Sequence, residues 1–135
     1  MRSYLWVALG GGLGAIGRYG LSLMIPSQEF PWSFFVINLS GSFVIGIIMA
    51  LAIDYAILSQ DIRLFIAVGM LGGYTTFSTF NYGVYHLLLQ NQFGLTLWYG
   101  VGSILGGLVA TIVGMAVARA WADWRQQENP DSADV

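Results

Sequence analysis

Residues 72–80 read Gly72-Gly73-Tyr74-Thr75-Thr76-Phe77-Ser78-Thr79-Phe80, and they lie in a stretch between Arg63 and Arg119 that contains no Asp, Glu, Lys or Arg. Two adjacent glycines followed by two β-branched threonines are poor helix material. In lipid, the free N–H and carbonyl groups of an interrupted helix are tolerated only inside protein or beside water. The segment therefore predicts a broken membrane helix, the kind of element with which membrane proteins present ion sites.

The composition indicates that the bilayer is the solvent of this chain. Hydrophobic residues make up 56% of its 135 residues, charged residues 9%, and the mean hydropathy is +0.68. The absence of Cys excludes a disulfide framework, and His86 is the sole histidine, so the donor count argues against a zinc or iron centre. The net charge of −2 without any Lys excludes nucleic acid as a partner.

Four apolar runs bounded by charges, Pro or Trp predict an all-α membrane protein with four transmembrane helices, the third of them broken. The expected spans are roughly 3–25, 32–54, 62–90 and 96–121. Residues 1–122 would form the membrane domain and residues 123–135 a polar C-terminal tail. Asp61 is the expected N-cap of the third span.

The aromatic and charged residues test this layout. Four crossings place Trp6, Trp121 and Trp124 on one face of the membrane and Trp32 and Trp98 on the other, as expected for interfacial Trp. Most arginines share the side of the termini, which favours cytoplasmic termini. The bias is small, and insertion in both orientations stays open.

The glycines favour close packing of helices. Gly12 to Gly17 match the G-x-G-x-x-G pattern, but no strand precedes them and no acidic residue follows about 20 positions later, which argues against a dinucleotide site. Three G-x-x-x-G pairs lie in different spans instead: Gly10 with Gly14, Gly69 with Gly73, and Gly102 with Gly106. Four short helices with such faces bury little core, so we expect a homo-oligomer.

Two spans carry polar stripes with a spacing of four residues. Asn38, Ser42 and Gly46 share one helical face, and Tyr99, Ser103, Gly107 and Thr111 share another. The Ser and Thr hydroxyls either bond carbonyls of their own helix or line a pathway. The Asn38 amide must bond a neighbouring helix or line something wet.

Phe77 and Phe80 lie three residues apart and share a face, with Ser78 and Thr79 beside them. A phenyl ring has a positive edge, so a ring presented edge-on can meet an anion without offering a full charge. Arg18 is the one charge well inside a span. It either extends to the interface or acts as a vestibule cation that attracts anions.

Three segments of this chain resemble, in order, the signature blocks of the CrcB/Fluc family of small fluoride channels. They are Gly11-Gly12-Leu13-Gly14-Ala15-Ile16-Gly17-Arg18-Tyr19, Val36-Ile37-Asn38-Leu39-Ser40-Gly41-Ser42-Phe43, and the segment from Gly72 to Phe80. The similarity runs from about residue 4 to 121.

The resemblance implies an antiparallel, dual-topology homodimer in the bacterial inner membrane, with two fluoride pores at its interface and a structural sodium ion at its centre. By position, it implies that the pore is lined by Asn38, Ser42, Phe77, Ser78, Thr79, Phe80, Tyr99, Ser103 and Thr111. Arg18 matches the vestibule cation, and the backbone carbonyls of Gly72 and Thr75 match the sodium ligands. The function implied is passive export of fluoride, without catalysis.

One position departs from the family pattern, because many relatives have Glu where this chain has Gly83, with His86 one turn later. A paralogous subunit as partner stays open. Two other functions are alternatives: a small four-helix multidrug/proton exporter, which would need a carboxylate inside the membrane, and a non-transporting membrane assembly subunit held by its glycine faces.

Overall fold

The computed structural model describes residues 2–27 and 29–128, and within these ranges the chain is helical with no strand. The predicted all-α class is therefore confirmed. The helix α1 (Arg2–Met24) is followed by α2 (Trp32–Met49), which continues into the π-helical segment η1 (Ala50–Asp54). Then come α3 (Gln60–Arg63), the π-helical segment η2 (Leu64–Met70), α4 (Leu71–Tyr74), α5 (Phe77–Leu89) and α6 (Phe93–Glu128).

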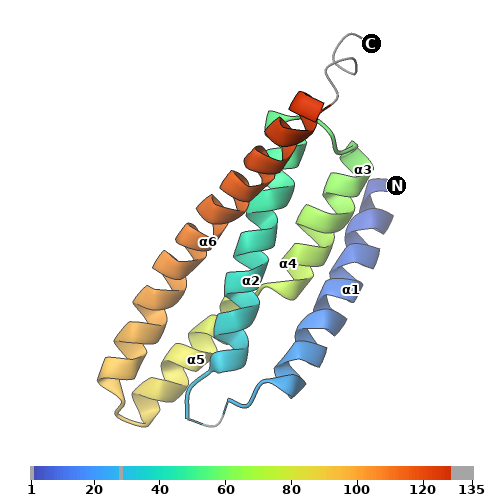
Figure 1. Ribbon diagram of the computed structural model, residues 1–135. Coiled ribbons are helices and arrows are strands. Elements are labelled where there is room, and N and C mark those ends of the chain that lie inside the picture. Colours follow the sequence, from blue (N-terminus) through green and yellow to red (C-terminus); the bar gives the residue numbers. More distant parts are fainter. Residues whose placement is uncertain (1, 28, 129–135) are drawn as a thin grey trace.

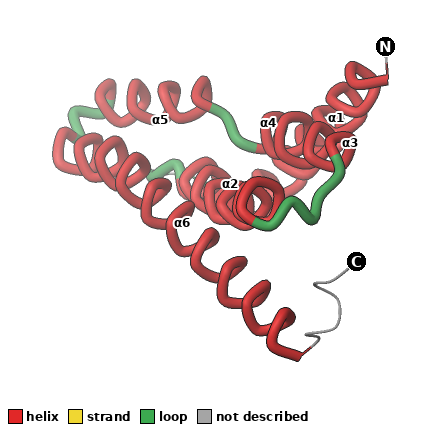
Figure 2. The backbone as a smooth tube through the Cα atoms, turned by 90° about the horizontal axis from the view of Figure 1, so that it is seen from above, coloured by secondary structure: helices red, strands yellow, loops and turns green. Residues whose placement is uncertain are grey.

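The helices form two packed groups that run side by side. Figure 1 shows α6 lying along α2, while α1 lies along the rod made of α3, η2 and α4. In the view from above, α5 leaves the line of α4 and lies beside the first part of α6 (Figure 2). The start of α1 and the end of α6 lie at the same end of the bundle (Figure 1).

Local sequence explains where the helices begin and end. The connection after α1 contains Pro26, and α2 starts directly after Pro31, because proline lacks the N–H that a preceding helix would need. Ser59, rather than the predicted Asp61, is the N-cap of α3, and its hydroxyl accepts a hydrogen bond from the Ile62 N–H. Asn91 turns the chain from α5 to α6 with a φ of 58°, a conformation that Asn tolerates well.

Glycines bring helices into backbone contact, but only some of those predicted. A Cβ on Gly14 would overlap the Met70 carbonyl, and one on Gly69 would come within 2.8 Å of the Val7 carbonyl. The G-x-x-x-G pair of α1 therefore faces the pair formed by Gly69 and Gly73. The third pair makes no backbone contact with another helix, since the nearest atom to a Cβ on Gly102 is 3.9 Å away and a Cβ on Gly106 would meet the Leu39 side chain of α2 at 3.1 Å. The helix α6 instead approaches α2 through Gly114, which lies on the Phe43 carbonyl.

The apolar side chains point outward more than inward. The buried cluster consists of Phe30, Leu87 and Tyr99, whereas large apolar residues along α1 and α6, such as Ile16 at 69% and Ile104 at 65%, are exposed. Within residues 2–27 and 29–128, two helical stretches, Trp32–Asp54 and Phe93–Glu128, are long and apolar enough to cross a membrane. An outward apolar surface of this extent needs lipid or a partner chain to cover it.

Two boundaries differ from the sequence expectation. The helix α6 begins before residue 96 and continues to Glu128, so residues 123–128 of the expected polar tail are helical. Asp54 and Arg119 form an ion pair with a distance of 2.8 Å near this end, which ties α6 to η1. Residues 129–135 of the expected tail lie outside the described residues.

Candidate functional site

The helical path is interrupted at Thr75 and Thr76, which both adopt extended conformations with ψ values of 154° and 127°. Thr75 closes the preceding helix, because its N–H and its hydroxyl both donate to the Leu71 carbonyl, at 2.9 and 2.8 Å. Thr76 opens the next helix as the N-cap of α5. The interruption is therefore locally capped on both sides.

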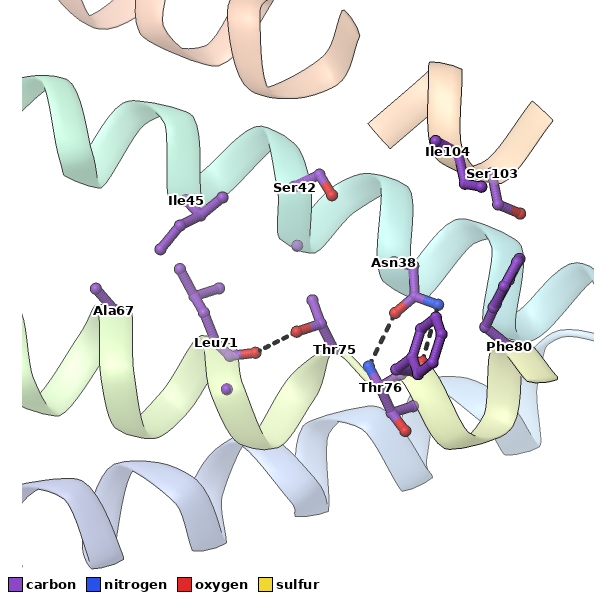
Figure 3. Close-up of a pocket in the computed structure, with 13 residues that line it drawn as sticks. Asn38, Ser42, Ile45, Ala67, Leu71, Thr75, Thr76, Phe80, Ser103 and Ile104 are labelled. Carbon is purple, nitrogen blue, oxygen red and sulfur yellow. Dashed lines mark hydrogen bonds between the residues drawn. The ribbon is translucent and has the colours of Figure 1, made fainter. Parts of the chain in front are cut away.

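The Asn38 side chain on α2 satisfies the backbone of Thr76. Its Oδ1 accepts from the Thr76 N–H at 2.9 Å, and its Nδ2 donates to the Thr76 carbonyl at 3.3 Å (Figure 3). The sequence left open whether this amide bonds a neighbour or lines a pathway. In the structure the amide makes this contact with a neighbouring segment, and the residue also lines the cavity described below.

The same contact releases carbonyl oxygens at the interruption. In a continuous helix the Thr76 N–H would donate to the Gly72 carbonyl, but here it donates to Asn38. The next carbonyl, that of Gly73, accepts from Arg18 Nε at 3.2 Å. Arg18 is only half-buried and lies at the C-terminal end of α4, where a cation is favoured by the helix dipole.

A cavity of about 470 Å³ lies between α2, the interruption and α6 (Figure 3). Among the described residues, no charged side chain lines it. Its wall contains seven residues predicted from the sequence: Asn38, Ser42, Gly72, Thr75, Phe77, Phe80 and Ser103. The remaining surface is mostly aliphatic, from residues such as Ile45, Leu71 and Ile104.

The two phenylalanines of the wall lie against each other. The rings of Phe77 and Phe80 are 5.7 Å apart between centroids and nearly parallel, at 27°. Phe80 also contacts Tyr99, at 5.5 Å, which joins it to the buried cluster. Phe77 is 74% exposed, so the outer part of this aromatic pair is open to whatever covers the chain.

Three buried hydroxyls predicted from the sequence have no hydrogen-bond partner among the described residues. They are Thr79 Oγ1 on α5, and Tyr99 OH and Ser103 Oγ on α6. Of the three residues, Ser103 lines the cavity and the other two do not. A buried hydroxyl without a partner costs about 1–3 kcal/mol. Ser103 is therefore a residue of the cavity wall whose hydroxyl makes no hydrogen bond within the described residues.

Two other predicted hydroxyls already have partners. Thr111 Oγ1 is 3.0 Å from both the Ser42 carbonyl and the Gly107 carbonyl, so it ties α6 to α2. Ser78 is exposed and its hydroxyl bonds Thr76 Oγ1 at 2.8 Å. Neither residue lines the cavity.

Sequence reasoning missed one polar contact beside the site. The hydroxyls of Ser40 and Tyr74 lie 2.9 Å apart and join α2 to the end of α4. Gly41 makes this approach possible, because a Cβ there would overlap the Thr75 methyl group. No spacing in the sequence signals the pair, since it depends on how two distant segments are aligned.

Comparisons with known proteins point to one family. Residues 5–115 match the family model described as CrcB-like protein, Camphor Resistance (CrcB). The chain is 43% identical over 123 residues to a fluoride-specific ion channel FluC of Thermus thermophilus, and the match covers 89% of this chain and 98% of the relative.

Two further relatives carry similar names. A fluoride-specific ion channel FluC of Chloroflexus aurantiacus is 39% identical over 122 residues, covering 88% of this chain and 97% of the relative. The fluoride-specific ion channel FluC 2 of Nocardia farcinica is 39% identical over 120 residues, covering 87% of this chain and 85% of the relative. The similarity is therefore spread over nearly the whole chain.

Two substitutions on α6, Thr111→Val and Ser103→Ala, compare the loss of a hydroxyl that makes hydrogen bonds with the loss of one that makes none. Thr111→Val removes the contact with the Ser42 carbonyl, so we expect it to lower the free energy of unfolding by about 0.5–1.5 kcal/mol. Ser103→Ala removes a hydroxyl without a partner, so we expect no loss. Unfolding of the detergent-solubilised protein with dodecyl sulfate measures both, and an equal loss in the two variants would contradict the assignment.

Proposed function

Because this chain belongs to the CrcB family, we propose that it is a fluoride-specific channel through which fluoride leaves the cell passively. The family resemblance predicted from three sequence segments is confirmed by the family match and by relatives of about 40% identity. The observation that carries the proposal is the uncharged cavity, whose wall contains Asn38, Ser42 and the unpartnered hydroxyl of Ser103.

Neutral donors suit the transport of fluoride. The ion is small and tightly hydrated, so a selective pathway must replace its water with hydrogen-bond donors, yet a fixed charge would hold the ion too strongly for release. In the cavity wall, the hydroxyl of Ser103 offers a donor, and the ring edges of Phe77 and Phe80 offer weak positive contacts. Ser42 adds a further hydroxyl to the wall.

Asn38 has a different role in this proposal from the one implied by the resemblance. Its amide holds the backbone of Thr76 and so keeps the interruption open beside the cavity. Thr111 ties α6 to α2, and the Ser78 hydroxyl bonds Thr76 within the first turn of α5, so neither acts as an ion donor. Arg18 stabilises the end of α4 through the Gly73 carbonyl, while its positive charge still favours anions near the site.

We propose that the chain crosses the inner membrane of a bacterial cell four times. The spans would be α1, α2 with η1, the broken rod from α3 to α5, and α6. The length and apolar character of Trp32–Asp54 and Phe93–Glu128 support two of these crossings. The parallel course of the other helices and their exposed apolar side chains support the remaining two (Figure 1).

The channel would be an antiparallel, dual-topology homodimer with two pathways at its interface. The exposure of Phe77 next to the cavity supports this assembly, because an aromatic wall of an ion pathway needs a covering surface. A paralogous subunit in the opposite orientation would supply the same surface. The multidrug/proton exporter gains no support, since no carboxylate lines the cavity within the described part of the chain.

A structural sodium ion at the dimer centre fits the oxygen atoms at the interruption. Hard cations take oxygen ligands, including backbone carbonyls. The Gly72 carbonyl has lost its helical donor, and Gly72 and Thr75 both lie in the cavity wall. A twofold axis would bring together the carbonyls of two chains, and the bound ion would fix the two interruptions relative to each other.

Sodium binding predicts a cation-specific gain in stability. The purified protein in sodium chloride should unfold at a higher temperature than in potassium chloride or N-methylglucamine chloride at the same ionic strength. The difference should grow with sodium concentration, because a ligand that binds only the folded state stabilises it by mass action. Equal melting temperatures in the three salts would contradict a sodium site.

Fluoride efflux from liposomes tests the proposed function and the aromatic part of its site. The wild-type protein should release fluoride and not chloride. Phe80→Ile should slow fluoride release by about tenfold, equivalent to roughly 1.4 kcal/mol and within the range of aromatic interactions. Phe35→Ile is the matched control, because Phe35 packs on the same buried cluster but does not line the cavity.

The outcomes separate function from site. If the wild-type protein releases no fluoride above protein-free liposomes, the channel proposal fails. If Phe80→Ile conducts at the wild-type rate, Phe80 is not part of the pathway. An equal loss in both variants indicates damage to the buried cluster instead.

A further inference from the structure

The hydroxyls of Tyr74 and Ser40, which lie 2.9 Å apart, join the last residue of α4 to α2. Ser40 Oγ also donates to the Ile37 carbonyl at 3.1 Å. Because a serine hydroxyl has a single proton, Tyr74 is the donor in its contact with Ser40. Neither residue lines the cavity of the proposed pathway, so the contact acts on the backbone and not on the ion in transit.

The ring of Tyr74 is held between two helices. The helix α4 lies between α1 and α2 (Figure 1). A Cβ on Gly41 of α2 would be 3.2 Å from Tyr74 Cδ1, and a Cβ on Gly17 of α1 would be 3.9 Å from Tyr74 Cδ2. Glycine at residue 41 thus leaves the space that the ring occupies. Packing on both faces and a hydrogen bond at its tip fix this side chain.

Two carbonyl groups on either side of Tyr74 in the sequence have lost their helical donors. The Gly72 carbonyl has lost its donor because the Thr76 N–H donates to the amide side chain on α2. In a continuous helix the Thr79 N–H would donate to the Thr75 carbonyl, but here it donates to Thr76 Oγ1 at 3.5 Å. Both oxygens are therefore suited to bind a cation.

The residues that precede Tyr74 cannot fix these carbonyls by themselves. Gly72 and Gly73 have no side chains, and glycine has the widest choice of backbone conformations. A Cβ on Gly72 would meet no atom within 4 Å, so no packing constrains the chain there. Tyr74 is the first residue after this pair, and its side chain ties the backbone to α2 directly before Thr75.

We propose that Tyr74 is a positioning residue for the cation. Through its hydrogen bond to Ser40 it fixes the angle between the Gly72 and Thr75 carbonyls, so that both oxygens point at one ion. This inference rests on the proposed sodium site. A cation held by oxygen atoms depends on the number and geometry of its ligands. Loss of the Tyr74 hydroxyl therefore lets one carbonyl turn away and weakens sodium binding.

Sodium titrations of the melting temperature test this assignment. The purified protein in detergent is titrated with sodium chloride, while N-methylglucamine chloride keeps the ionic strength constant. The sodium concentration needed for a fixed rise in melting temperature scales with the dissociation constant. Tyr74→Phe keeps the ring and removes the hydroxyl, and Ser40→Ala removes its partner. Each variant should need about twofold to tenfold more sodium than the wild-type protein, as expected for one lost hydrogen bond.

Tyr55→Phe is the matched control. It also removes a tyrosine hydroxyl that donates a hydrogen bond, to Asp123 Oδ1 at 2.6 Å, but at the end of the bundle where α6 meets the segment after η1. It should leave the sodium requirement at the wild-type value. The double variant Tyr74→Phe with Ser40→Ala should need no more sodium than the more affected single variant, because both changes remove the same contact.

Every outcome decides the assignment. If Tyr74→Phe and Ser40→Ala lower the melting temperature in all salts but keep the wild-type sodium requirement, the contact is only structural and the inference is overturned. An equal change in Tyr55→Phe, or additive changes in the double variant, also overturns it. If Tyr74→Phe does not fold, Ser40→Ala decides alone. A wild-type protein without any response to sodium overturns this inference together with the sodium site, while fluoride efflux from liposomes judges the channel proposal separately.

Discussion

The amide of Asn38 donates to one backbone group of Thr76 and accepts from the other, and the architecture around the cavity depends on this double contact. An interrupted helix inside a membrane leaves backbone groups that water cannot reach, each at a cost of several kcal/mol. An amide is suited to this position because it has both a donor and an acceptor. The chain can therefore keep two extended residues within an apolar bundle.

The consequences extend outward from the interruption. The helix α5 starts afresh at Phe77 and leaves the line of α4 (Figure 2). This course brings Phe80 against Tyr99. The carbonyl of Gly72 loses its helical donor, which makes oxygen available to a cation. The wall that results is neutral, and the charged pairs, such as Asp54 with Arg119, lie away from it near an end of the bundle. The wall thus offers a ligand partial charges and no full charge.

Much of this arrangement follows from the sequence, because it depends on local composition. Two glycines and two threonines at residues 72–76 predicted the interruption, and the spacing of four residues placed Asn38 and Ser42 on one face. Both residues line the cavity. The apolar runs predicted the long helices. The end of α6 was not predicted, because residues 123–128 are polar, and yet they are helical.

The pairing of hydroxyls could not be predicted, because it depends on which helices meet. Thr111 and Ser103 belong to the same stripe, yet Thr111 bonds the Ser42 carbonyl and Ser103 has no partner among the described residues. The spacing of Gly102 and Gly106 indicated a packing face, and Gly106 does lie close to the Leu39 side chain of α2, but the backbones of α2 and α6 meet at Gly114 instead. The alignment of α6 along α2 decides both outcomes, and no local pattern encodes it.

Hydrogen exchange at the Thr76 amide tests most directly whether Asn38 holds the interruption. Mass spectrometry of the peptide that contains residues 72–80 measures it in the wild-type protein, in Asn38→Ala, and in Ser42→Ala as a control from the same wall. We expect exchange in this peptide to become faster by about tenfold or more in Asn38→Ala, which corresponds to a lost bond of roughly 1.4 kcal/mol. Ser42→Ala should exchange at the wild-type rate. Wild-type exchange in Asn38→Ala would contradict the account, because the interruption would then persist without the amide that is held to support it.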